Sequence, residues 1–490
     1  MAELTVVDTP RFYLLYLENN AQVTMSQVSL NSTNGQADFV QIVSGGPVTV
    51  ADSSFSYGRT AFEFYNDGLT LENTDIFGMY TGFIHYSTGL LKMSGCNWKD
   101  CSQGIRAYSG QVHVESCSFV GIDDLAIFVE NATLSVQDSV FDTVRCQYGN
   151  PAILLNGTNP SGQITNSVFN TSSALTNTEI AIYGTNGTLT IQSCDIIGLT
   201  GGGIFSTNAD VTLSDSYLES TTVYLYGGAA SVNNTQFILA DVVFESLVAS
   251  SSISYSVLNA TKTPLTLLPQ SYPFTVDHCN FTMIGTSPSA RHILGSSLGD
   301  ISISHSLFEN MIGSVFNSLA LKSPGAVKIT NCDFRNNSFD GGSIMNITNA
   351  DGLALENVTF SQAGDPDYTT NYGIAFKNCS GISLTNVLFT DLMLGNSLIE
   401  INASSASAHF SQIEAHNNQA QRFVNAYGSV TSFVLEQANL INNSFSNGEL
   451  MMTTSPDVLL LNVVVQQDGE ARIYSATSDA SPIFNLTNVA

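Results

Sequence analysis

The chain has 490 residues and a formal net charge of −27, because 14 Lys+Arg stand against 41 Asp+Glu. With so few cations, no partner is expected among nucleic acids or anionic membrane surfaces, which bind clusters of Lys and Arg. Although 43% of the residues are hydrophobic, no run of about twenty apolar residues occurs, so no direct membrane span is predicted.

A short repeat runs through the chain. Each copy reads apolar-x-apolar-x-turn-small-x-aromatic, as in LTLENTDIF (69–77), VHVESCSFV (112–120) and VKITNCDFR (327–335). We call the small residue of each copy its station. In chain order the stations are residues 28, 53, 74, 96, 117, 139, 167, 194, 216, 235, 256, 279, 306, 332, 358, 387, 413, 438 and 463. A spacing of about 24 residues indicates one coil of a solenoid for each copy.

The positions around the station alternate between apolar and variable residues. Three positions before the station every residue is apolar, from Met25 to Leu460. This period of two predicts a short strand with one face turned inward. Two positions after the station we expect an internal aromatic stack, formed by Phe55, Trp98, Phe119, Phe141, Phe169, Phe237, Phe281, Phe308, Phe334, Phe360 and Phe389.

The residue directly before the station is most often Asn, Asp or Gly, as at Asn73 and Asp138. These residue types tolerate left-handed backbone angles, so we expect a sharp corner between two strands at this position. Tyr255, His278 and His305 are exceptions to the residue preference.

One coil of this length cannot enclose its own apolar face, whereas stacked coils pair their strands in parallel and bury the apolar columns together. Propeller blades need about 40–45 residues each, and the leucine-rich pattern is missing. The sequence therefore predicts an all-β, right-handed parallel β-helix solenoid of about nineteen coils. We expect a single domain over 1–490, with core coils over about 20–470 and irregular ends.

Several copies resemble a known group of proteins. The segments VKITNCDFRNN (327–337) and ISISHSLFENM (301–311), with the glycine runs GGGIF (201–205) and GGSIM (341–345), are similar to the right-handed β-helix of pectin-lyase-like proteins. In repeat style they resemble the GGAI and FxxN repeats of polymorphic outer-membrane and adhesin-like surface proteins. The resemblance covers about 28–465 and implies the β-helix fold.

The same resemblance implies where a catalytic pair would lie. Pectin-hydrolysing enzymes of this fold use an Asn-Thr-Asp element and an Asp-Asp pair, to which Asn73-Thr74-Asp75 and Asp123-Asp124 look similar. Two coils, or roughly 10 Å, would separate Asp75 from Asp123. An inverting glycosidase needs roughly 6.5–9.5 Å between its carboxyl groups. Since Gly-His-Gly and Arg-x-Lys elements are also missing, we expect no catalytic residues and a structural role for Asn73-Thr74.

Acidic residues and histidines are the candidates for a metal site. Lyases of this fold need a calcium site and a base, for which the candidates are Asp123 and Asp124 with Arg145, or Asp365 with Asp367. Scattered surface acids on an acidic chain are the alternative, so we predict no cofactor and leave calcium as an open alternative. The seven histidines show no pair at metal-ligand spacing, and no His-based metal site is predicted: His85, His113, His278, His292, His305, His409 and His416.

Five of the eight cysteines occupy stations, where Ser and Thr also stand, so we expect small core residues there. The five are Cys96, Cys117, Cys194, Cys279 and Cys332. Cys101, Cys146 and Cys379 lie off the station and could be free or bridged. Because no C-x-x-C motif occurs, neither a zinc ribbon nor a thioredoxin-type site is indicated.

Sequons for N-glycosylation are moderately over-represented. We consider thirteen of them as acceptor candidates: Asn31, Asn131, Asn156, Asn170, Asn186, Asn233, Asn259, Asn336, Asn346, Asn378, Asn402, Asn442 and Asn485. Together with the low Lys content and the many Ser, Thr and Asn residues, they favour an extracellular or cell-surface glycoprotein.

The first functional interpretation is a structural protein without enzymatic activity. No amphipathic capping helix is predicted at either end, and uncapped coils favour end-to-end self-association into a surface filament. One alternative is a polysaccharide lyase or hydrolase of the pectin-lyase-like fold. Another is a glycan-binding adhesin that uses outward aromatic residues such as Tyr108 or Tyr148.

Overall fold

The computed structural model describes residues 2–6, 13–18, 22–33, 35–65, 68–144, 150–170, 180–199, 202–260, 263–283, 291–296, 299–310, 312–313, 317–322, 324–339, 342–361, 370–453, 455, 457–466, 472–475 and 483–487. Every regular element in these ranges is a β-strand, and none of them contains a helix long and apolar enough to cross a membrane. The chain divides into two compact units, Met1–Ser231 (unit 1) and Val232–Ala490 (unit 2).

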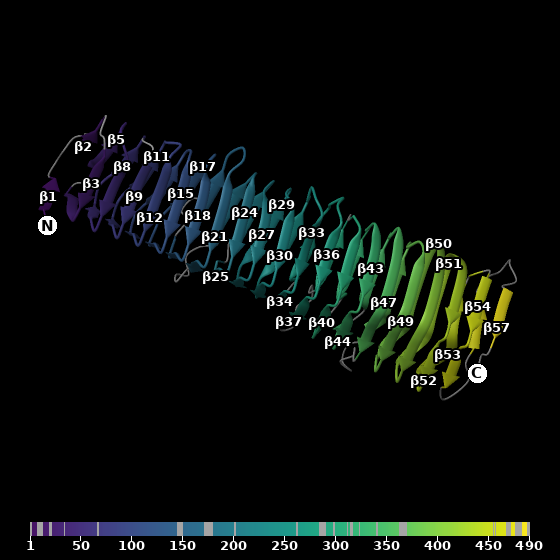
Figure 1. Cartoon of the computed structure of the whole chain (residues 1–490). Coiled ribbons are helices and arrows are strands. Elements are labelled where there is room, and N and C mark those ends of the chain that lie inside the picture. Colours follow the sequence, from purple (N-terminus) through teal and green to yellow (C-terminus); the bar gives the residue numbers. More distant parts are fainter. Residues whose placement is uncertain are drawn as a thin grey trace. The chain divides into compact units, whose positions relative to one another are not determined.

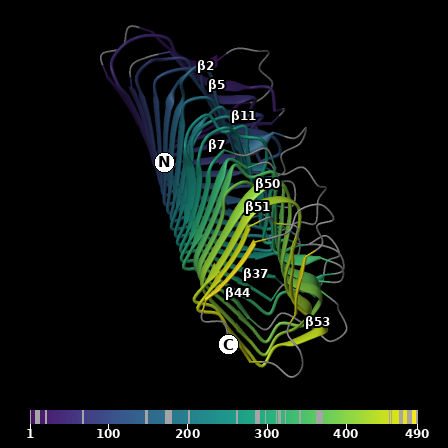
Figure 2. The ribbon, with the colours of Figure 1, turned by 90° about the vertical axis from the view of Figure 1, so that its right-hand side faces the viewer.

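Each coil contributes up to three strands, and each strand pairs in parallel with the equivalent strand of the next coil (Figure 1). We call the strand before the corner series B, the strand after it series C, and the strand that follows series C series A. In the turned view, the strands of successive coils run side by side within each unit (Figure 2).

Series A of unit 1 comprises β2 (Tyr13–Leu17), β5 (Asp38–Ile42), β8 (Thr60–Phe64), β11 (Thr81–His85), β14 (Gln103–Ala107), β17 (Leu125–Glu130), β20 (Pro151–Asn156), β23 (Ile180–Thr185), β26 (Gly202–Thr207) and β29 (Thr222–Tyr226). Series B comprises β3 (Val23–Ser26), β6 (Val48–Ala51), β9 (Gly68–Glu72), β12 (Leu90–Ser94), β15 (Gln111–Glu115), β18 (Thr133–Gln137), β21 (Ser161–Thr165), β24 (Thr188–Gln192) and β27 (Asp210–Ser214). Series C comprises β1 (Ala2–Val6), β4 (Val28–Ser32), β7 (Ser54–Ser56), β10 (Asp75–Phe77), β13 (Asn97–Lys99), β16 (Ser118–Val120), β19 (Val140–Asp142), β22 (Val168–Asn170), β25 (Asp195–Ile197) and β28 (Tyr217–Glu219). The boundary between the units falls within β30 (Ala230–Asn233).

Series A of unit 2 comprises β32 (Asp241–Glu245), β35 (Leu265–Leu267), β38 (Ile293–Ser296), β42 (Leu319–Lys322), β46 (Ser343–Thr348), β48 (Thr370–Lys377), β53 (Ser444–Thr453) and β56 (Arg472–Ser475). Series B comprises β33 (Ser251–Ser254), β36 (Phe274–Asp277), β39 (Ile301–Ser304), β43 (Ala326–Thr330), β54 (Asp457–Leu461) and β57 (Ile483–Thr487). Series C comprises β31 (Gln236–Ile238), β34 (Val257–Ala260), β37 (Asn280–Met283), β40 (Leu307–Glu309), β44 (Asp333–Arg335), β52 (Asn439–Ile441) and β55 (Val464–Gln466). Three strands run through corners, β47 (Gly352–Ser361), β49 (Ile382–Thr390) and β50 (Leu394–His416). The strand β51 (Gln419–Glu436) joins series A to series B and ends before the corner at Gln437. A short pair is formed by β41 (Ile312–Gly313) and β45 (Ser338–Phe339).

The stations set the register of both units. Asp75 pairs with Ser54 on one side and with Asn97 on the other, which aligns stations 53, 74 and 96. The same alignment continues to station 216 in unit 1 and runs from station 235 to station 463 in unit 2. The predicted all-β parallel solenoid is therefore confirmed.

The corner before each station adopts left-handed backbone angles, as the sequence predicted. Asn73 has a φ of 46° and Asp138 a φ of 51°. The exceptions in residue type follow the same geometry, with φ values of 51° at Tyr255, 51° at His278 and 48° at His305. The stacked coils thus impose the corner even where the side chain is bulky.

Hydrogen bonding explains why the station is Ser, Thr or Cys over most of the chain. The Ser139 hydroxyl donates to the carbonyl of Gln137 (2.8 Å) and accepts the backbone N–H of Cys117 in the preceding coil (3.2 Å). Ser167 repeats both bonds one coil later. A buried N–H that the corner removes from the strand ladder is satisfied in this way. A small apolar residue would fill the space without supplying this acceptor.

The aromatic column of the stations lies in the interior. Phe119, Phe141 and Phe169 are at most 1% exposed, and their ring centroids are 4.9 and 4.6 Å apart with interplanar angles of 1° and 2°. In unit 2, Phe308 and Phe334 are stacked at 4.5 Å and 9°. Each ring therefore covers the next along the interior of its own unit.

Buried asparagines supply hydrogen bonds at a second corner, between series C and series A, in several coils of unit 2. Stations 358, 387 and 413 are aliphatic, and there the strand passes through the corner without a break. At the next corner Asn418 donates to the carbonyl of Phe389 (3.0 Å), and Asn443 donates to that of Ala415 (2.7 Å). Asn337 makes the equivalent bond to Phe308 (2.8 Å), which gives a physical reason for the Phe-x-x-Asn spacing of Phe334 and Asn337.

Candidate binding surface

An uncharged stripe follows the outer side of series A in unit 1. Phe128, Leu154, Tyr183, Phe205 and Tyr224 are register partners on five consecutive coils. The alternation of these strands turns their neighbours into the core and leaves these five side chains partly exposed. We call them the series A stripe. It presents apolar and aromatic surface on a chain that is otherwise strongly acidic.

Contacts along the stripe hold its rings in place. The rings of Phe205 and Tyr224 are 5.5 Å apart at 27°, and the Tyr183 hydroxyl lies 3.2 Å from the Thr207 hydroxyl. The Arg106 guanidinium lies 6.0 Å from the centre of the Phe128 ring, within reach of a cation–π interaction. The uncharged series A stripe therefore ends at Arg106.

A ladder of three tyrosines borders the stripe, of which Tyr65 and Tyr86 are exposed and Tyr108 is partly exposed. The ring centroids of Tyr65 and Tyr86 are 4.7 Å apart, those of Tyr86 and Tyr108 are 5.0 Å apart, and Tyr108 meets Phe128 at 5.7 Å. The tyrosine faces cover one another, so ring edges and hydroxyls remain for a ligand. Burial, followed by the nearby Tyr108 and Glu63, raises the pKa of Tyr86, which keeps its hydroxyl protonated as a donor.

Glu63 joins the ladder to the earlier coils of unit 1. Its carboxylate accepts hydrogen bonds from the hydroxyls of Tyr65 (2.6 Å) and Tyr13 and from the Gln41 amide (3.3 Å). Beside it, Arg59 donates from Nε to Asp38, a carboxylate that is almost fully buried (2.9 Å). The carboxylates of Glu63 and Asp38 thus already accept hydrogen bonds from neighbouring side chains.

A second carboxylate lies on the outer side of series A in unit 2. Glu400 is only 2% exposed and accepts the Tyr427 hydroxyl at Oε1 (2.8 Å), while its Oε2 has no donor at hydrogen-bonding geometry among the described residues. Burial and the hydrogen bond to Glu400 raise the pKa of Tyr427 to about 12. Tyr372 also approaches this carboxylate, and burial and that contact raise its pKa. The Glu400 carboxylate thus lies beside the protonated hydroxyls of Tyr372 and Tyr427.

The catalytic pair considered from the sequence is not assembled. Asp75 lies in β10 of series C and accepts from Asn97 (2.9 Å), whereas Asp124 directly precedes β17 of series A and accepts from Gln103 (2.6 Å). The two acids thus belong to different series of strands. Asn73 and Thr74 take corner and station positions, with the Thr74 hydroxyl donating to the Glu72 carbonyl (3.0 Å), so the structural interpretation of this element holds. The remaining sequence candidates, Arg145, Asp365, Asp367, Tyr148 and Cys146, lie outside the described residues.

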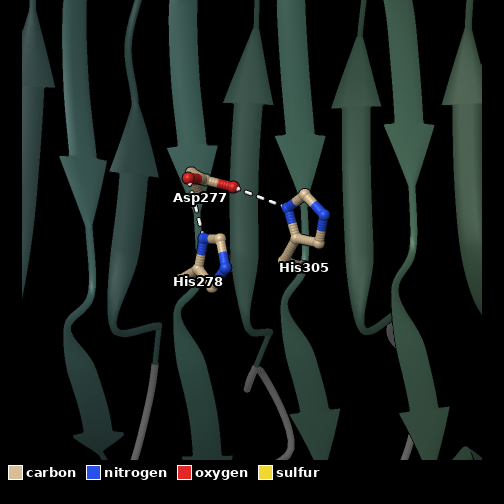
Figure 3. A group of neighbouring side chains, drawn as sticks. All are labelled: Asp277, His278 and His305. Atoms are coloured by element: carbon tan, nitrogen blue, oxygen red, sulfur yellow. Dashed lines mark hydrogen bonds and ion pairs between the residues drawn. The ribbon is translucent and has the colours of Figure 1, made fainter.

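Two histidines that the sequence treated as dispersed lie together. His278 and His305 are stacked with ring centroids 4.5 Å apart, and both are bonded to Asp277 (Figure 3). The spacing of 27 residues between them is one coil, so they occupy the same corner on neighbouring turns. Contacts across a solenoid occur at the coil length rather than at the short spacings of local metal motifs. By contrast, His292 is buried, and its burial lowers its pKa to about 3.

The cysteines and the sequons are placed as follows. All seven cysteines within the described residues are buried free thiols, including those at the stations, and burial raises the pKa of Cys194 to about 11. Six of the thirteen candidate asparagines are exposed: Asn131, Asn170, Asn233, Asn336, Asn378 and Asn442. Asn31 and Asn259 are less accessible, since their side-chain oxygens are buried.

Comparisons with known proteins bear on the fold. A family model described as "Right handed beta helix region" matches residues 13–159, which agrees with the handedness predicted for the crossovers. No curated protein matches the chain at a significant level. Among solved structures, a PL6 family alginate lyase, AlyGC, covers 100% of both chains at 9% identity and a TM-score of 0.27. The A-module of the mannuronan C-5 epimerase AlgE6 of Azotobacter vinelandii covers 91% of both chains at 10% identity and a TM-score of 0.18. Likenesses this low carry no argument about function.

Proposed function

We propose that the protein is a glycan-binding β-helix that holds an extended, uncharged carbohydrate chain on the series A stripe of unit 1. The observation that carries this proposal is the run of five register-paired, partly exposed and uncharged side chains from Phe128 to Tyr224. It develops the glycan-binding interpretation of the sequence in preference to a purely structural role.

The chemistry of the stripe suits sugars. Carbohydrate sites combine aromatic surface with a few fixed polar groups, and tyrosine supplies both. Neighbouring coils repeat at roughly 4.8 Å, so a chain lying across the strands would meet an equivalent side chain at each step. The hydroxyls of Tyr183 and of the tyrosine ladder would supply donors along the same path.

The net charge of the protein favours neutral over acidic glycans. A net charge of −27 repels polyuronates unless a cation intervenes, and the stripe itself contains no cationic side chain. A neutral polysaccharide experiences no such repulsion. We therefore expect β-glucan or xylan to bind better than alginate or polygalacturonate.

Affinity electrophoresis with these four polysaccharides tests the proposal. Combined Tyr183→Ser and Phe205→Ser substitutions remove two ring contacts, each worth about 0.5–1.5 kcal/mol beyond its burial, so we expect at least about tenfold weaker binding of the neutral chains. Tyr272→Ser, at an exposed ring in unit 2, is the matched control and should leave binding unchanged. Equal binding by the stripe variant and the control would refute the proposal.

A polysaccharide-cleaving enzyme is the second candidate, and Glu400 favours it. A buried carboxylate beside two tyrosine hydroxyls is an arrangement that can transfer protons, and such groups contribute about 10²–10⁴-fold to rate. The test is cleavage of neutral and uronate polysaccharides with and without calcium. Activity that falls by at least about 10²-fold in Glu400→Gln, but survives in the control Glu436→Gln, would support it. Activity that is undetectable or unaffected by Glu400→Gln would exclude this site.

Self-association into a filament stays a proposal, with one supporting feature. Within the described residues, β2 pairs only with β5 and β3 only with β6, so each has an outer edge without a strand partner. Such edges are templates for pairing with another chain. Sedimentation velocity over a range of concentrations should show growing species if these edges pair, and a single monomer throughout would count against it. We also propose that this filament or adhesin is extracellular and glycosylated.

A further inference from the structure

Asp277, His278 and His305 form a cluster at one corner of unit 2. Asp277 is the last residue of β36, and His278 directly follows it at the corner. His305 takes the same corner position one coil later, directly after β39, and Asp277 is the register partner of Ser304. The topology therefore brings two imidazoles and a carboxylate from neighbouring coils to one place.

The side chains face one another. His278 Nδ1 lies 2.8 Å from Asp277 Oδ2, and His305 Nδ1 lies 3.1 Å from Asp277 Oδ1 (Figure 3). One potential ligand atom from each residue lies within 4.8 Å of the others. The exposed fractions of the side chains are 28% for Asp277, 42% for His278 and 47% for His305, so a solute ion can reach them.

The corner by itself does not require histidine. The next three corners of the same column hold Asn331, Asn357 and Asn386, which form a ladder of amide hydrogen bonds at 2.9 and 2.7 Å. Asparagine thus satisfies both the left-handed backbone and the stacking of coils. The replacement of this ladder by two imidazoles beside a carboxylate calls for a reason other than the fold.

We propose that Asp277, His278 and His305 bind a divalent transition-metal ion of the Zn²⁺, Cu²⁺ or Ni²⁺ class. Two imidazole nitrogens and one carboxylate oxygen are the donors that these ions prefer, whereas calcium takes oxygen ligands. Metal–ligand bonds of about 2.0–2.2 Å require the three atoms to move closer together. Their side chains are exposed enough to do so by rotation. Three protein ligands leave a coordination position open to water or a further ligand.

The charge of the site is suited to a cation. Three polar groups contact the Asp277 carboxyl group: the Ser304 hydroxyl and the Nδ1 atoms of His278 and His305. Ser304 donates to the same Oδ1 (2.6 Å), which fixes the orientation of the carboxylate.

Asn331 adds a partner behind the imidazole of His305. Its amide nitrogen lies 3.0 Å from His305 Nε2, which places the proton of a neutral His305 on Nδ1 in the metal-free protein. A metal bound at Nδ1 moves that proton to Nε2, where an oxygen acceptor is then needed. Asn331 can supply one by turning its amide, and a carboxylate at this position would do so without turning.

Isothermal titration of the full chain with zinc chloride tests the proposal, with nickel and calcium chloride in parallel. We expect one zinc site, weakened at least about tenfold in His278→Asn and in His305→Asn, and no comparable calcium site. Both variants introduce the residue that neighbouring corners already hold, so the fold should persist, which circular dichroism verifies. His409→Gln, at an exposed histidine paired with Glu436, is the matched control and should bind zinc like the unmodified chain.

Asn331→Asp should strengthen zinc binding, whereas the histidine substitutions should weaken it. A carboxylate that accepts the Nε2 proton strengthens an imidazole ligand, so we expect zinc binding about tenfold tighter than in the unmodified chain.

Absence of zinc binding in the unmodified chain would overturn the proposal. So would zinc binding that is unchanged when His278→Asn and His305→Asn are combined. Neither result depends on glycan binding by unit 1.

Discussion

At the scale of single residues, the station side chain completes the hydrogen bonding of a buried corner. Ser139 is 1% exposed, and its hydroxyl is the acceptor for the amide of Cys117. The sequence showed that the station must be small, because its column holds few residue types. It did not show why Ser, Thr and Cys dominate, since the amide partner belongs to another coil.

Ser139→Ala should destabilise the fold, because it leaves the backbone amide of Cys117 without an acceptor. We expect a loss of about 1–3 kcal/mol in the free energy of unfolding, because a buried donor is left without an acceptor. Ser139→Cys should lose less, because a cysteine at the equivalent position, Cys194, accepts the backbone amide of Ser167 in the preceding coil. Urea unfolding measures both. Ser135→Ala, at an outward position of the same coil, is the control, and an equal loss there would contradict the explanation.

His292 should make unit 2 sensitive to acid. Its burial, opposed by a bond to the Glu309 carbonyl, lowers the folded-state pKa to about 3, whereas an unfolded histidine has a pKa of about 6.5. Between these values the unfolded chain binds the extra proton, so stability present above about pH 6.5 is lost as the pH falls toward 3.

We expect this loss to be on the order of a few kcal/mol and to be smaller in His292→Gln. Urea unfolding at pH 7 and at about pH 4.5 gives the comparison. His409→Gln, at an exposed site, should keep the full pH dependence. An identical pH dependence in all three proteins would show that other groups dominate.

At the scale of the element, each strand is stabilised mainly by its equivalent in the next coil. The Phe141 ring is stacked between Phe119 at 4.9 Å and Phe169 at 4.6 Å, so its removal would leave a cavity between two buried rings. The period of two and the corner column located such strands from sequence, because the inward face repeats in every coil.

Phe141→Ala should therefore cost about 3–5 kcal/mol in the free energy of unfolding of unit 1, the range for a buried ring replaced by a cavity. Thermal or urea unfolding followed by circular dichroism measures it. Phe77→Ala, at a partly exposed ring of series C, is the matched control and should cost clearly less. Comparable costs for the two would contradict an interior stack.

At the scale of the whole molecule, the exposed sequons predict a pattern of glycosylation. If the chain is produced in a glycosylating host, we expect glycans at exposed positions such as Asn131, Asn233 and Asn378, and little or none at Asn31 and Asn259, whose side-chain oxygens are buried. Peptide mass spectrometry after enzymatic deglycosylation in heavy water reports occupancy at each site. Occupancy at Asn31 equal to that at Asn131 would contradict the prediction.

The sequence by itself determined the solenoid class, the register and the corners, because the residue pattern behind each of these features recurs at the same position of every repeat. It also predicted that Asn73 and Thr74 take the corner and station positions, where the structure places them. Only the tertiary structure decided which side chains of different coils meet. The pairing of His278 with His305, and the run from Phe128 to Tyr224, depend on neighbours a full coil away. Such contacts leave no local spacing to recognise, because the coil length varies and outward positions tolerate almost any residue.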